Sequence, residues 1–132
     1  MRLLLDTNVL LLGTLGELPR RADALINDLN NEVYYSSAAL WEIAIKTKIG
    51  KLELNMSTRA FENELLRQGY QPLSITTEHA HQTILLNDIP GHKDPFDRMM
   101  VAQSICEGMT LITTGQALAA YDQQTIMVVN RR

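Results

Sequence analysis

The chain alternates short apolar runs, which predict strands, with longer segments in which apolar residues recur at helical spacing. The run RLLLD (2–6) is apolar and ends in an acid, and VYYSS (33–37) is β-branched and aromatic, so both have the character of buried strands. The predicted strands lie at residues 2–6, 33–37, 72–75, 110–114 and 125–129.

Helices are predicted between these strands, and several of their ends carry clear signals. The segment SSAALWEIAIKTKIG begins with serines that can cap a helix, and it ends at Gly50. In HKDPFDRMMVAQ, Pro95 follows a capping Asp94 and stands at the first helical position, where its missing N–H costs nothing. The predicted helices cover residues 7–13 (or to 16), 19–31, 38–50, 57–69, 77–89, 95–107 and 116–121.

Strands that alternate with helices predict βαβ units, and therefore a parallel sheet with helices on both faces. The length of 132 residues fits one domain, residues 1–132. Ligands of such sheets bind beyond the carboxyl ends of the strands. Polar residues at those ends are therefore the first candidates for a site.

Composition narrows the class of protein. The chain is 45% hydrophobic and 20% charged, with a formal net charge of −3, which argues against a general nucleic-acid coat. The four lysines are nevertheless placed near two of the acids, since Lys46, Lys48 and Lys51 follow Glu42 and Lys93 directly precedes Asp94. A weakly acidic protein of this kind can still present one basic rim.

The single cysteine, Cys106, excludes an internal disulfide and fits a reducing compartment. It lies in an apolar helical run, which predicts a buried thiol rather than a nucleophile. No apolar stretch approaches the length of a transmembrane helix. We therefore expect a cytoplasmic protein that is not attached to a membrane.

Three acids fall where the predicted fold brings the chain to one edge of the sheet. Asp6 ends the first strand, and Glu42 lies in the first turns of the helix after the second strand. Asp97 joins them if the loop before its helix returns to the same edge. Each acid also has a purely structural interpretation: Asp6 as a helix cap, Glu42 as the partner of Lys46 four residues on, and Asp97 as a complement to the helix dipole.

These structural interpretations must hold independently, whereas one metal site explains all three acids together. Clustered carboxylates repel one another until a cation is bound, and an all-oxygen set suits Mg²⁺ or Mn²⁺ rather than Zn²⁺. Such ions act on phosphates, whose anionic backbone the nearby lysines and Arg98 would hold. His79 and His81 are two positions apart on a predicted helix, so they point to different faces and make poor joint ligands.

Four blocks of the sequence stand out in order: LLLDTNVLL, SSAALWEIAIKTKIGKLEL, HKDPFDRMMVAQ, and LITT followed by ALAAY. Together they resemble the PIN domain of VapC-type toxin ribonucleases, over essentially the whole chain. The resemblance implies an α/β fold, a three-layer α/β/α sandwich on a parallel sheet of five strands. It also implies a Mg²⁺- or Mn²⁺-dependent endoribonuclease that cleaves RNA, forms a homodimer and is inhibited by a cognate antitoxin protein.

Carried over position by position, the resemblance assigns the family's acidic metal-site residues to Asp6, Glu42 and Asp97. These three are the expected catalytic and metal-binding residues. Asp94 matches an acid common in the DPFDR subgroup and is expected to act as a cap first and a ligand second. Contacts with the RNA substrate are expected from Asn8, Lys46, Lys93, Arg98, Thr113 and Thr114.

The chain departs from the family pattern at one position. The family places a fourth acid after the strand, in a Thr/Ser-x-Asp pattern, whereas here Gly115 follows Thr113 and Thr114. Reduced activity is therefore expected, and a catalytically weakened PIN module that binds RNA or an antitoxin is the alternative function. A metal-dependent phosphatase or receiver-like domain is disfavoured, because no phosphoacceptor aspartate with a following lysine switch is evident.

Overall fold

The structure is a computed structural model, and it describes residues 1–88, 90, 94–115, 118, 121 and 125–129. The described residues form five strands and six helices. The strands are β1 (Arg2–Leu5), β2 (Glu32–Ser36), β3 (Gln71–Leu73), β4 (Thr110–Thr113) and β5 (Ile126–Val128). The helices are α1 (Thr7–Leu15), α2 (Arg20–Asn27), α3 (Ser37–Lys48), α4 (Thr58–Arg67), α5 (Thr77–Thr83) and α6 (Pro95–Glu107).

The five strands form one sheet in the order β3-β2-β1-β4-β5, and every neighbouring pair is parallel. The central strand β1 is buried because helices cover both faces of the sheet, as parallel sheets require. In its register, Leu5 pairs with Tyr35 on one side and with Ile112 on the other. The predicted five-stranded parallel sheet is thus confirmed.

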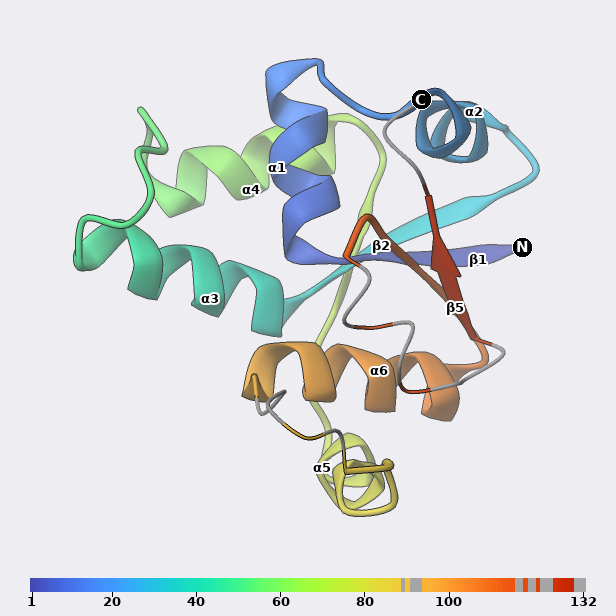
Figure 1. The fold of residues 1–132 in the computed structure, drawn as a ribbon. Coiled ribbons are helices and arrows are strands. Elements are labelled where there is room, and N and C mark those ends of the chain that lie inside the picture. The colour runs from blue at the N-terminus through green and yellow to red at the C-terminus, as the bar shows by residue number, and fades with distance from the viewer. Residues whose placement is uncertain (89, 91–93, 116–117, 119–120, 122–124, 130–132) are drawn as a thin grey trace.

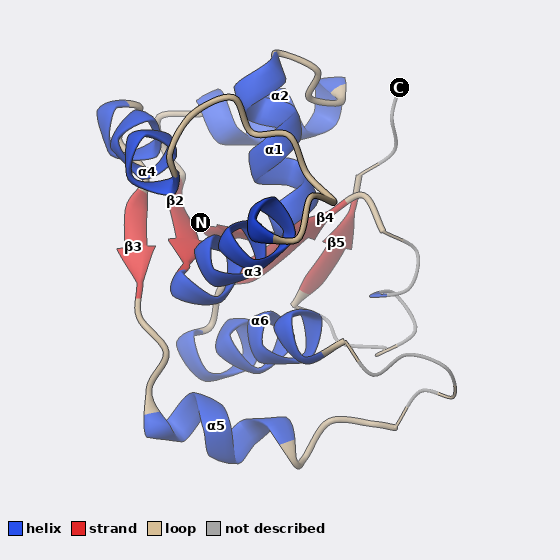
Figure 2. Ribbon diagram, turned by 90° about the vertical axis from the view of Figure 1, so that its left-hand side faces the viewer, coloured by secondary structure: helices blue, strands red, loops and turns tan. Residues whose placement is uncertain are grey.

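Helices pack on both faces of the sheet. They also connect successive strands from β1 to β4, as in βαβ units. Figures 1 and 2 both show α1, α2 and α4 on one side of the sheet and α5 and α6 on the other, which confirms the predicted α/β/α sandwich. Helix α3 extends outward from the end of β2, with the beginning of α6 close by (Figure 1). The beginnings of α1 and α3 therefore lie at the carboxyl edge of the sheet.

Most predicted helices agree with the structure, and the helix predicted over 77–89 is the clearest exception. It begins as expected at a cap, where the Thr76 side chain accepts from the His79 amide and the His79 side chain accepts from the Thr76 amide. Helix α5 ends at Thr83, however, and leaves Ile84 84% exposed and Leu85 72% exposed. Leu86 is buried in the core, but its neighbours Ile84 and Leu85 face solvent, so the apolar residues there do not form one helical face that packs on the core. The helix predicted over 116–121 lies mostly outside the described residues.

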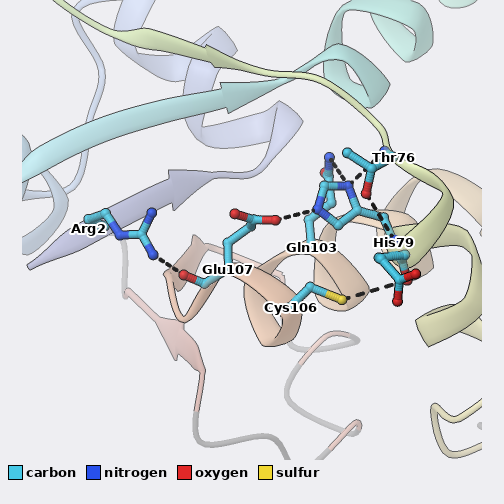
Figure 3. A network of polar contacts seen from close by, with 7 residues as sticks. Arg2, Thr76, His79, Gln103, Cys106 and Glu107 are labelled. Carbon is cyan, nitrogen blue, oxygen red and sulfur yellow. Dashed lines mark hydrogen bonds and ion pairs between the residues drawn. The ribbon is translucent and has the colours of Figure 1, made fainter.

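A polar network around the buried His79 connects α5 to the end of α6, on the opposite side of the sheet from α1 (Figures 2 and 3). His79 is fully buried, its Nδ1 accepts from the Thr76 amide at 3.0 Å, and its Nε2 lies 2.8 Å from Glu107 Oε2. Since Nδ1 is an acceptor, Nε2 carries the proton and donates to Glu107. Arg2 donates to the carbonyl of Glu107, which links the network to β1. This network is a structural clasp between elements.

The prediction of a buried cysteine was wrong. Cys106 is exposed, and its Sγ lies 3.7 Å from the carbonyl of Glu78. Helix α6 buries the side chains of Met100 and Val101 against the sheet, and Cys106 stands on another face. The apolar residues of α6 therefore extend around more of the helix than the face that packs against the sheet.

None of the helices in the described part of the chain has the length and apolar character needed to cross a lipid bilayer.

Candidate active site

A pocket of about 220 Å³ opens at the carboxyl edge of the sheet, where α1, α3 and α6 begin. The three acids singled out by the sequence, Asp6, Glu42 and Asp97, all line it. They come from three separate elements, so the fold brings together residues that are far apart in the chain. The remaining described residues of the lining are Thr7, Asn8, Leu11, Lys46, Thr113, Thr114, Gly115 and Leu118.

Asp6 is held between the first strand and the first helix. Its amide donates to the Ile112 carbonyl at 3.0 Å, which extends the pairing of β1 with β4 by one residue. Its Oδ1 accepts from the Val9 amide at 2.9 Å and so caps α1, while Oδ2 accepts from the Thr113 hydroxyl. The cap interpretation is therefore correct, and the carboxylate faces the pocket as well.

Burial raises the pKa of Asp6 to about 6. The hydrogen bonds from Thr113 and Val9 lower this pKa, and the negative charges of Asp97 and Glu42 raise it further. Asp6 is only 6% exposed, so water does little to screen these effects. The negative charges of Asp6, Glu42 and Asp97 therefore lie close enough to destabilise one another.

Glu42 is aimed into the pocket by α3. The helix is capped by Ser36, whose Oγ accepts from the Ala38 amide at 3.0 Å, and this fixes which residues of its first turns face inward. Thr7 donates its hydroxyl to Glu42 Oε1 at 2.6 Å, and Lys46 Nζ lies 2.7 Å from Oε2. Both oxygens of a buried carboxylate are therefore engaged.

Asp94 and Asp97 have different places at the start of α6. Asp94 Oδ1 accepts from the Phe96 amide at 2.9 Å and from the Asp97 amide at 3.1 Å, so Asp94 is the N-cap. Asp97 lines the pocket together with Asp6, so α6 begins at the edge of the sheet where Asp6 lies. The cap aims the first turn of α6, and the first turn carries Asp97 to the other acids.

Most of the polar residues that were expected to contact the substrate line the pocket, but Arg98 is outside its described lining. Asn8 Nδ2 donates to Thr114 Oγ1 at 2.6 Å, and both residues line the pocket together with Thr113 and Lys46. Their hydroxyl, amide and ammonium groups share the pocket with the acids. Asn8, Thr114 and Lys46 are therefore placed where a ligand of the pocket would meet them, whereas Thr113 is fully buried.

Arg98 points elsewhere. Its Nη2 donates to the Thr83 carbonyl at 3.0 Å, and its guanidinium carbon lies 5.8 Å from the centre of the Tyr121 ring. The guanidinium thus joins α6 to the end of α5, and Arg98 is absent from the described lining of the pocket. Lys93 lies outside the described residues.

Gly115, which stands where the sequence resemblance leads one to expect a fourth acid, lines the pocket. Its amide donates to Thr113 Oγ1 at 2.9 Å, and a Cβ added to it would lie 3.4 Å from the same oxygen, in van der Waals contact. Its φ is outside the left-handed region that favours glycine. The backbone therefore does not require a glycine here.

Thr7 was not predicted as a site residue, although it holds Glu42. The available signal was a hydroxyl between Asp6 and Asn8, on the first turn after the first strand. Thr113 was expected to meet the substrate, but its hydroxyl is already given to Asp6. Both hydrogen bonds join segments that are distant in sequence, so no local sequence pattern indicates them.

The donor set fits a hard divalent cation in its chemistry. Three carboxylates and several hydroxyls face one pocket, and oxygen ligands are those that Mg²⁺ and Mn²⁺ prefer. In the described part of the chain, however, no three His, Cys, Asp or Glu side chains are gathered closely enough to hold a metal ion. The acids are instead engaged by the protein, Asp6 by Val9 and Thr113, and Glu42 by Thr7 and Lys46.

The family model described as "PIN domain" matches residues 3–124. The chain belongs to the PIN domain family. Ribonuclease VapC16 of Mycobacterium tuberculosis (strain ATCC 25618 / H37Rv) is 36% identical to this PIN domain over 59 residues, which are 44% of this chain and 40% of the relative. The match thus spans less than half the length of that relative.

Solved structures have the same fold. VapBC2 from Rickettsia felis, bound to a DNA fragment from its promoter, superposes with a TM-score of 0.70 at 15% identity and covers 98% of each chain. FitAcB from Neisseria gonorrhoeae gives a TM-score of 0.66 at 20% identity, over 98% of this chain and 97% of that chain. At these identities the likeness concerns the fold of this PIN domain.

Proposed function

We propose that this PIN domain is a divalent-metal-dependent endoribonuclease and the toxin of a toxin–antitoxin pair. One observation carries the proposal: Asp6, Glu42 and Asp97, from three elements, line one pocket at the carboxyl edge of a parallel sheet. Membership of the PIN family and the partial match to a ribonuclease support the reaction class.

In this proposal Asp6, Glu42 and Asp97 would hold Mg²⁺ or Mn²⁺. A bound ion of this kind polarises a phosphoryl oxygen and makes a coordinated water more acidic. The carboxylates of Asp6 and Glu42 are already oriented by Val9, Thr113 and Thr7, so they need little rearrangement when a phosphate arrives. Glu42 would orient the attacking water.

A bound cation would offset the negative charge of the pocket when a substrate phosphate enters. Three carboxylates repel a phosphodiester, and Lys46 is the one basic residue among the described residues of the lining. Asn8 and Thr114, which are hydrogen-bonded to each other at the rim, offer neutral donors to the RNA backbone. The RNA would thus be held by hydrogen bonds at the rim and by opposite charge at the centre.

The proposed partners are RNA as substrate and a cognate antitoxin protein, with a homodimer as the assembly. The name of the curated relative, Ribonuclease VapC16, supports the substrate class. The fold shared with VapBC2 and FitAcB supports the antitoxin, together with the sequence resemblance to VapC-type toxins.

A second function is favoured by a specific observation, the glycine at position 115. Without an acid there, the pocket has Asp6, Glu42 and Asp97 as its anionic ligands, which suffices for one hydrated cation and less readily for two. A PIN module that binds RNA or an antitoxin and cleaves slowly is therefore the second candidate.

The test is an RNA cleavage assay with Mg²⁺ or Mn²⁺, with and without a chelator. Asp97→Asn should abolish chelator-sensitive cleavage with the fold intact. The matched control is Asp88→Asn, since Asp88 is exposed and lies outside the described lining of the pocket. Cleavage by Asp97→Asn at the wild-type rate would refute the site, and RNA binding without any cleavage would support the binding module.

A further inference from the structure

Lys46 occupies an unusual place for a surface lysine. It lies one turn after Glu42 on α3, and its Nζ is 2.7 Å from Glu42 Oε2. The Glu42 side chain is 7% exposed, whereas that of Lys46 is 46% exposed. A solvent-accessible ammonium is therefore paired with a buried carboxylate inside the pocket.

The ammonium interacts with more than one acid. It contacts Glu42 on its own helix, and the negative charges of Asp94 and Asp97 at the start of α6 also act on it. The pKa of Lys46 is raised, first by its hydrogen bond to Glu42, while burial works against the rise and the charges of all three acids add to it. Lys46 therefore neutralises part of the negative charge that α3 and α6 bring together.

We propose that Lys46 is an internal counter-cation, which engages Glu42 while no divalent ion is bound and competes with such an ion for that carboxylate. The inference rests on the proposed metal-dependent function. An ammonium and a divalent cation on the same carboxylate repel each other, so one of them weakens the binding of the other. The lysine has a flexible four-carbon stem that reaches solvent, so the ammonium is the group that can leave.

The competition has a consequence for the order of events. The affinity of the pocket for a divalent ion is lower than its acids alone would give, because Lys46 already occupies one of them. Once displaced, the ammonium remains at the mouth of the pocket, where an entering phosphate would meet it. One side chain thus stabilises the pocket without metal and faces the substrate with metal.

The direct test measures Mn²⁺ binding, by the electron paramagnetic resonance signal of free Mn²⁺, and needs no cleavage. Lys46→Met removes the positive charge and keeps an unbranched apolar side chain. It should tighten Mn²⁺ binding about three- to tenfold, which is the effect expected of one charge that is neither fully exposed nor fully buried. Lys46→Arg should stay near the wild type. The matched control is Lys48→Met, a neighbour on α3 that is outside the described lining of the pocket.

A second measurement uses the unmodified protein, so it does not depend on a variant that folds. Acetic anhydride labelling, read by mass spectrometry, should modify the Lys46 amine faster when Mg²⁺ is added, while Lys48 reacts at the same rate with and without Mg²⁺. Equal labelling of Lys46 in both conditions would overturn the inference.

The outcomes also separate this inference from the proposed function. Mn²⁺ binding that is unchanged or weaker in a folded Lys46→Met overturns the counter-cation and leaves the metal-dependent function standing. Absence of Mn²⁺ binding in the wild type and all variants removes both. Tighter binding in Lys46→Met alone supports both.

Discussion

Replacing Asp6 with asparagine keeps the size of the side chain and removes its charge. Asparagine is also a good N-cap, so its Oδ1 can still accept from the Val9 amide. The hydroxyl of Thr113 can turn to accept from the new amide group. The substitution therefore tests the cost of the buried charge more than the loss of its contacts.

The magnitude follows from the pKa. Burial raises the pKa of Asp6 from 3.8 to about 6, and each unit of difference between folded and unfolded protein is about 1.4 kcal/mol. The ionised carboxylate thus lowers the free energy of unfolding by roughly 3 kcal/mol above pH 6. The pair of hydrogen bonds on Asp6 is already included in this shift.

The sign of the pH dependence is fixed by the same shift. The folded state binds the Asp6 proton more tightly than the unfolded state, so this group makes the protein more stable as the pH falls from about 6 towards 3.8. Asp6→Asn lacks the titration. The free energy of unfolding of the variant minus that of the wild type should therefore be largest above pH 6 and shrink by roughly 3 kcal/mol as the pH falls below 4.

The assay is denaturant unfolding followed by circular dichroism from pH 3 to pH 8, in a chelating buffer so that no divalent ion contributes. Only the pH dependence of the difference in free energy of unfolding between the variant and the wild type is interpreted. A difference that does not change with pH would reflect altered hydrogen bonds. A difference that stays constant over this range would refute the buried, crowded carboxylate. Adding Mg²⁺ at pH 8 should then stabilise the wild type more than Asp6→Asn, since the ion neutralises the charge.

Three further predictions follow from single contacts. Asp94→Ala should cost about 0.5–2 kcal/mol in denaturant unfolding as a lost N-cap, and its cleavage rate at saturating Mg²⁺ should fall less than that of Asp97→Asn; the opposite order would place Asp94 in the site. Gly115→Asp should bind Mn²⁺ more tightly than the wild type in a titration, because it adds an anionic ligand at a position with room for a Cβ; equal affinity would make the fourth acid dispensable. His79→Leu should lower the free energy of unfolding by about 1–3 kcal/mol because the Glu107 carboxylate loses its buried donor, and an unchanged value would refute the clasp.

The pH dependence and the counter-cation both depend on contacts that the sequence could only partly predict. The pairing of Glu42 with Lys46 was predictable, because residues four apart on a helix are neighbours. The hydroxyl of Thr7 on the same carboxylate was not, because it joins residues 35 positions apart. The same holds for Thr113 on Asp6, a contact across 107 positions.

Some elements were determined by local physics and so could be predicted closely. Helix α6 has Asp94 as its cap and Pro95 at its first position, and these signals act within one turn, so its predicted bounds of 95–107 are confirmed. The parallel sheet followed from the alternation of strands and helices. Where no local signal ended the pattern, as after Thr83, the predicted helix was too long.

By itself, the sequence determined the α/β class, the caps, and the acids that end or follow its strands, because periodicity and capping are properties of neighbouring residues. Only the tertiary structure decided that Asp97 shares a pocket with Asp6 and Glu42, and that Arg98 turns away to Thr83. It also exposed Cys106, since which face of an apolar helix is buried depends on what packs against it. Contacts between distant segments depend on the packing of the whole chain, and no local pattern encodes them.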